Sequence, residues 1–161
     1  YATGKDGHRH WITSSAVEIR DYDKLDDRDG MYFSLDETMK NYFRASGNNI
    51  SAGISIFQDK TDARPYEYLG ASCTVSGEAT LPWNITLYSR VRYKTSEYAE
   101  KEALAPEKRS DTEYQAVLGL GRKTLKGWGI DLNHQYTHND STFGLYEYSR
   151  NVTTLSVNYL F

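Results

Sequence analysis

Three cations at alternate positions are the residues in this sequence best placed to do chemistry. Arg90, Arg92 and Lys94 are separated by Val91 and Tyr93, so a β-strand would present all three cations on one face. Such a row either pairs with carboxylates from neighbouring strands or lines a passage for anionic or sugar-like cargo. We expect the paired arrangement, because buried charges without partners are costly.

The same alternation assigns further charged residues to this face. On each predicted strand, the residues opposite the apolar positions are polar or charged. With the cations above, these residues form one set of candidate site residues, which we call the charge ladder: Glu18, Arg20, Arg90, Arg92, Lys94, Glu113, Asp131 and Arg150. Asp36 and Lys40 have the same parity.

The histidines could serve metal binding or catalysis, but their surroundings favour neither. His8 and His10 precede the first strand, and no cysteine or carboxylate cluster has the spacing of a metal site. His134 and His138 share the outward parity of Tyr136. A Ser–His–carboxylate site assembled across strands is the one enzymatic alternative. We expect no enzyme activity, no metal and no cofactor.

The sequence pattern places these residues on β-strands. Eight segments alternate between apolar and polar residues, which is typical of strands with one apolar face: about 10–20, 31–43, 50–58, 66–79, 85–94, 112–123, 128–138 and 146–161. The connections after the odd-numbered segments are mostly long and charged, whereas those after the even-numbered segments are short. This alternation is typical of outer-membrane β-barrels, with long extracellular loops and short periplasmic turns.

Composition supports the same class of protein. The chain has 161 residues with 19 Lys+Arg against 22 Asp+Glu, which argues against nucleic-acid binding driven by charge. No apolar run approaches the roughly 18 residues of a spanning helix. The 14 Tyr and three Trp suit the aromatic belts that barrels place at membrane surfaces.

The second segment fits a lipid-facing strand poorly. Its apolar face contains Met31, Phe33 and Leu35, but also Glu37 near its middle. A charge facing lipid at mid-bilayer costs about 2–4 kcal/mol for a cation and less for Glu. We therefore expect a bulge near Asp36 and Glu37, a protein partner at this strand, or different strand limits.

The last segment carries the most specific signal. Leu155, Val157, Tyr159 and Phe161 alternate with polar residues, with Leu160 as the one apolar exception. This pattern resembles the C-terminal strand of Gram-negative outer-membrane β-barrels. The resemblance implies the bacterial outer membrane as location, and outer-membrane lipid and the barrel-assembly machinery as partners.

The region from 114 to 161 resembles the closing strands of particular barrels. The residues that carry the resemblance are Gly127-Trp128-Gly129, Asn139-Asp140-Ser141-Thr142, the stretch 145–151 and Tyr159-Leu160-Phe161. They are similar to the C-terminal ends of surface-lipoprotein assembly modifiers and exopolysaccharide-export porins.

We therefore predict a single all-β domain over 1–161, an antiparallel up-and-down transmembrane β-barrel of about eight strands, with a periplasmic arm at 1–9. Its expected role is a structural and interaction platform with a side-chain-filled lumen and extracellular binding loops, especially 95–111.

The alternative is a C-terminal part, or one subunit, of a larger outer-membrane pore for transport or export. A soluble lipocalin-like barrel would need an apolar interior, which the charge ladder disfavours. In a complete barrel the last strand pairs with the first near Trp11 to Ile19; without that pairing, the chain is part of a larger assembly.

Overall fold

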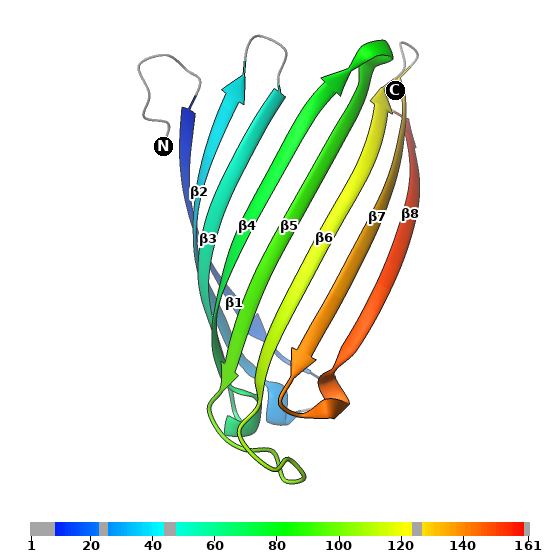
Figure 1. The fold of residues 1–161 in the computed structure, drawn as a ribbon. Helices are drawn as coiled ribbons and strands as arrows, with labels where there is room; N and C mark the ends of the chain where they lie inside the picture. The colour runs from blue at the N-terminus through cyan, green and yellow to red at the C-terminus, as the bar shows by residue number, and fades with distance from the viewer. Residues whose placement is uncertain (1–8, 23–25, 44–47, 124–126, 160–161) are drawn as a thin grey trace.

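A computed structural model describes residues 9–22, 26–43, 48–123 and 127–159. Eight strands form one antiparallel sheet in chain order (Figure 1): β1 (Arg9–Arg20), β2 (Gly30–Phe43), β3 (Asn48–Thr61), β4 (Tyr68–Leu81), β5 (Ile85–Tyr98), β6 (Ser110–Lys123), β7 (Trp128–Ser141) and β8 (Tyr148–Tyr159). Four 3₁₀ turns complete the described chain: η1 (Asp26–Arg28), η2 (Arg64–Tyr66), η3 (Pro82–Asn84) and η4 (Gly144–Tyr146). None of the described segments is a helix able to cross a membrane.

The predicted all-β, up-and-down arrangement is confirmed. The turns η1, η2 and η4 and the connection between β5 and β6 gather at one end, which we call the loop end (Figure 1). We call the opposite end, where β1 begins and β8 ends, the terminal end. The strands run further toward the loop end than predicted: β5 continues to Tyr98 and β6 starts at Ser110. The long loop is therefore 99–109 rather than 95–111, because polar residues extend the ladder beyond the apolar band.

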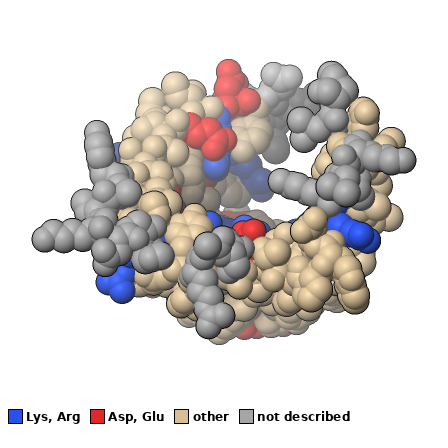
Figure 2. All heavy atoms as spheres, turned by 90° about the horizontal axis from the view of Figure 1, so that it is seen from above, with Lys and Arg blue, Asp and Glu red and all other residues tan. Residues whose placement is uncertain are grey.

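The polar face of the sheet is concave. Side chains on this face bridge strands that are not neighbours: Arg20 of β1 bonds Asp59 of β3, and Lys94 of β5 lies over the ring of Phe57 of β3. Such contacts need a sheet that curls toward its polar side. The end-on view shows the resulting hollow, with charged side chains inside it (Figure 2).

The convex face is apolar and exposed, as the alternation predicted. Many of its large apolar residues are about half exposed or more, among them Ile19 at 75%, Ile54 at 67%, Leu69 at 62%, Leu118 at 59% and Leu155 at 68%. The described part of the predicted C-terminal signal lies here too, with Val157 at 59% and Tyr159 at 49%. Phe161 lies outside the described residues.

The sheet has two open edges. Pairing runs from β1 to β8 without joining these two strands anywhere in the described ranges. All twelve residues of β8 are exposed, and ten of the twelve in β1. The strand pairing expected between the last strand and Trp11 to Ile19 is therefore not found among the described residues.

Strand β2 carries Glu37 without a bulge. It pairs one residue to one with β1 and with β3 along its length, so the expected bulge is wrong. Glu37 faces the convex side, where the hydroxyl of Thr13, its partner on β1, donates to Oε1 at 2.6 Å. A neighbouring hydroxyl thus partly satisfies the carboxylate. Arg9, the last residue of the predicted arm, belongs to β1, and the rest of that arm, residues 1–8, lies outside the described residues.

Candidate functional site

The charge ladder lies on the concave face, and its central ion pair joins β5 to β6. Arg92 Nη2 lies 2.7 Å from Glu113 Oε1. Glu113 stands directly opposite Lys94 in the register, yet it binds Arg92 and the hydroxyl of Tyr148, which donates to Oε2 at 3.2 Å. One carboxylate therefore links three strands, because β8 also reaches it across β7.

Lys94 is held by aromatic rings. Its Nζ lies 4.8 Å from the ring centroid of Phe57 and 5.8 Å from that of Tyr68, within range of cation–π attraction. Phe57 itself covers Gly70, its partner on β4, where a Cβ would stand 2.2 Å from the ring. A glycine opposite an inward aromatic residue is the sequence signal that could have located this contact.

A second cluster forms at the loop end of β1 to β3. Arg20 Nε lies 3.1 Å from Glu18 Oε1, and Arg20 Nη1 also bonds the carboxylate of Asp59. The guanidinium lies 4.6 Å from the ring centroid of Tyr32. The Asp59 side chain is only 7% exposed. Sequence reasoning missed it because 59–65 was assigned to a charged connection, whereas β3 continues through it to Thr61.

The remaining ladder residues are not part of these clusters. Asp131 on β7 accepts a hydrogen bond of 2.8 Å from the Tyr88 hydroxyl of β5. Tyr88 crosses over Gly119 of β6 to reach it, since a Cβ there would lie 2.2 Å from the tyrosine ring. Arg90 and Arg150 have the same parity but are exposed. The structure thus brings the ladder together at the loop end more than along its whole length.

The most densely bonded part of the concave face surrounds Arg109, just before β6. Its guanidinium bonds both carboxylate oxygens of Asp111, with Nε 2.9 Å from Oδ1. It lies 3.3 Å from the ring centroid of Tyr146 and 4.3 Å from that of Tyr98. Glu102 completes this Arg109 cluster: its Oε1 lies 3.7 Å from Arg109, and its Oε2 accepts a bond of 2.9 Å from the Tyr146 hydroxyl.

The surroundings of the Arg109 cluster raise the pKa values of both Arg109 and Tyr146. Burial lowers the pKa of Arg109, but the hydrogen bond to Asp111 and nearby negative charge outweigh it and raise that pKa overall. The pKa of the Tyr146 hydroxyl is raised, first by burial and then by its hydrogen bond to Glu102. Arg109 therefore stays charged and Tyr146 stays neutral at ordinary pH. The sequence did not identify the cluster, because its members come from loops and strand ends.

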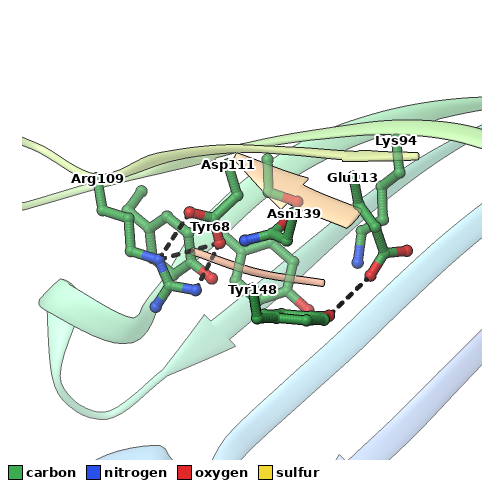
Figure 3. A pocket seen from close by; sticks show the side chains of 9 residues that line it. Tyr68, Lys94, Arg109, Asp111, Glu113, Asn139 and Tyr148 are labelled. Carbon is green, nitrogen blue, oxygen red and sulfur yellow. Dashed lines mark hydrogen bonds and ion pairs between the residues drawn. The ribbon is translucent and has the colours of Figure 1, made fainter. Parts of the chain in front are cut away.

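Two adjoining cavities open beside the Arg109 cluster. The smaller, of about 170 Å³, holds polar groups of both charges (Figure 3). Its lining residues are Tyr68, Lys94, Ser96, Tyr98, Arg109, Asp111, Glu113, Asn139 and Tyr148. The larger, of about 280 Å³, shares Tyr68, Tyr98 and Arg109 with it. Hydroxyls, rings and paired charges suit a small polar or sugar-like group. Within the described ranges no three His, Cys, Asp or Glu residues converge as metal ligands.

Comparison with known proteins identifies the family. A family profile described as surface lipoprotein assembly modifier matches residues 7–161. The chain belongs to this family. Searches of curated proteins and of solved structures found no match.

Membership in the surface lipoprotein assembly modifier family confirms one of the two resemblances read from the C-terminal residues and extends it over most of the chain. The family is associated with the outer membrane. The alternation along the strands predicted the charge ladder, whereas the Arg109 cluster is located by the structure alone.

Proposed function

We propose that this chain forms the wall of a β-barrel in the bacterial outer membrane, with its convex face in lipid and its loop end outside the cell. The observation that carries the proposal is the division of one curled sheet into an apolar exposed face and a polar concave face. An aqueous protein would reverse these faces to bury its apolar side chains. Tyr93 and Tyr114, with ring centroids 5.2 Å apart, face outward in the manner of an interfacial belt.

The proposed role is a platform for assembling lipoproteins at the cell surface. The family description supplies the client class. The loop end supplies the contact surface: Leu104 in the long loop is 87% exposed and Leu145 in η4 is 77% exposed. Two exposed leucines beside the Arg109 cluster favour contact with a client protein or partner. Strand β2 is a second place where a protein partner could bind.

A specific observation favours the larger-pore alternative for the barrel itself. Both β1 and β8 lack a second neighbour in the described structure. Within lipid, each backbone N–H and C=O needs a partner, so an open edge is not stable there. We infer that these edges pair with further strands, which makes the lumen wider than an eight-stranded ring allows. Anionic or sugar-like cargo would then pass the charge ladder.

The test uses the full-length gene product expressed with a surface lipoprotein in a Gram-negative host. Antibody binding to intact cells measures lipoprotein display, and heat-modifiable migration on a gel measures barrel folding. The double variant Leu104→Ser and Leu145→Ser should reduce display several-fold while folding is retained.

The matched control is Trp83→Ser, which removes a residue 79% exposed at the terminal end. Display should stay at the wild-type level in this variant. Equal display in all three proteins would refute the loop end as the contact surface. Extraction of the protein without detergent would refute the membrane barrel.

A further inference from the structure

A hydrogen-bonded serine, histidine and aspartate meet on the convex face of the β7–β8 hairpin. His138 on β7 stands opposite Ser149 on β8, and its Nδ1 lies 2.8 Å from Ser149 Oγ. Its Nε2 lies 3.0 Å from Oδ1 of Asp140, two residues further along β7. A nucleophile bonded to a base, which is bonded in turn to an orienting carboxylate, is the arrangement that activates a serine.

The three groups are open to a ligand. The side chain of His138 is 32% exposed and that of Asp140 is 57% exposed, and Ser149 is exposed as well. The carboxylate selects the His138 tautomer that carries its proton on Nε2. Nδ1 is then the acceptor of the Ser149 hydroxyl proton.

A second histidine on the same face provides an internal comparison. His134 Nδ1 lies 2.8 Å from Thr153 Oγ1, and its Nε2 lies 3.2 Å from Asn151 Oδ1. This group has an amide where the first has a carboxylate, so it lacks the negative charge that stabilises an imidazolium. Only the group near the loop end has all three parts of a charge-assisted site.

We propose that Ser149, His138 and Asp140 form an esterase site for carboxylic esters of lipid acyl chains. This activity goes beyond the platform role and rests on it in one respect, the placement of the convex face in lipid. The site lies at the loop-side limit of the apolar face, next to Tyr114, the partner of His138 on β6. With the convex face in lipid, as proposed, the limit of the apolar face would lie at the edge of the hydrocarbon core, where the ester bonds of membrane lipids lie.

The reaction balances with water as the only co-reactant. Ser149 Oγ attacks the carbonyl carbon, its proton passes to His138, and the ester C–O bond breaks. The alcohol leaves with that proton. Water then attacks the acyl group on Ser149 and gives one proton to His138, which returns it to Ser149 as the fatty acid departs. Asp140 acts as a positioning residue that orients the ring and stabilises its positive charge.

The direct test is covalent labelling of the full-length protein in outer-membrane vesicles with a fluorophosphonate probe. We expect mass spectrometry to place the probe on Ser149. Ser149→Ala and His138→Gln should each lower labelling of this peptide by about 100-fold or more. Thr153→Ala, from the comparison group, should leave it within twofold of wild type. Absence of the probe from Ser149 in correctly folded wild-type protein would overturn the proposal.

Two further measurements separate catalysis from structure and from the proposed function. Asp140→Asn should lower kcat for a short-chain acyl ester at least tenfold with KM unchanged, and Asp140→Glu should restore part of it; equal loss in both would show a structural role only. Fluorescent phospholipid vesicles and an acylated lipoprotein serve as separate substrates for the two sources of ester. Lipoprotein display without labelling would refute the esterase and leave the platform intact, whereas labelling without display would do the reverse.

Discussion

The two ends of the sheet are stabilised by different interactions. At the loop end, Arg109, Asp111 and Glu102 have side chains 11–14% exposed, so protein rather than solvent surrounds their charges. At the terminal end, the outward-facing rings of Trp128 and Tyr159 have centroids 4.8 Å apart, and η3 forms a tight turn. The loop end is therefore held together by buried charge pairs, whereas the described part of the terminal end has an exposed ring pair and a tight turn.

The largest effect should come from removing the cation of the loop end. Arg109→Ala leaves Asp111 and Glu102 buried without their partner, which should lower the free energy of unfolding by about 3–5 kcal/mol. Guanidinium unfolding of the protein in lipid vesicles, followed by tryptophan fluorescence, measures the change.

The control for Arg109 is Arg90→Ala, because Arg90 is an exposed arginine of the same concave face. We expect a loss within about 0.5 kcal/mol there. Similar losses for the two variants would show that the Arg109 cluster is no more stabilising than a surface arginine, and would remove the contrast between the ends.

Two glycines beneath aromatic rings allow a matched comparison of the ends. A Cβ at Gly70 would lie 2.2 Å from the Phe57 ring and 2.4 Å from the backbone oxygen of Thr95, whereas at Gly119 the three nearest atoms all belong to the Tyr88 side chain, the first at 2.2 Å. Backbone cannot move aside as a side chain can. We expect Gly70→Ala to cost about 3 kcal/mol and Gly119→Ala about 1 kcal/mol, both measured by guanidinium unfolding. The reverse order would place the rigid region at the terminal end.

The sequence predicts features that follow from alternation within one strand, but not contacts between segments far apart in the chain. Alternation along each strand gave the sheet, the topology and the side of residues such as Arg92 and Leu155, because a strand places every second side chain on one face. The Arg109 cluster could not be found that way. Its contacts join residues from a loop, two strands and η4, and depend on curvature that alternation does not encode. Asp59 was missed for a related reason, since its charge made a strand end resemble a connection.

Alkaline pH should weaken the loop end. The pKa of Tyr146 is raised above its ordinary value by burial and by the bond to Glu102. The stabilisation from the neutral phenol is therefore complete below about pH 10, the pKa of an unfolded tyrosine, and is lost as the pH rises toward the folded pKa. Tyr146→Phe should cost about 1–3 kcal/mol at pH 8, because Glu102 loses a donor, and should flatten the decline above pH 10. If the free energy of unfolding of the variant fell just as steeply above pH 10, the decline would come from other groups.

The smallest effect should appear at the terminal end and should be a gain. Trp83 and Asn84 in η3 have φ of 62° and 56°, in the left-handed region that a bulky side chain enters at a cost of about 1–2 kcal/mol. Asn tolerates this conformation, and Trp83 is 79% exposed, so little packing is lost on replacement. Trp83→Asn should raise the free energy of unfolding by about 0.5–1 kcal/mol in detergent micelles, with Trp11 and Trp128 still reporting fluorescence. In vesicles the gain should shrink, because an indole at the membrane surface contributes lipid contacts there. An equal gain in both media would mean that Trp83 makes no use of the membrane, and that turn conformation alone stabilises the terminal end.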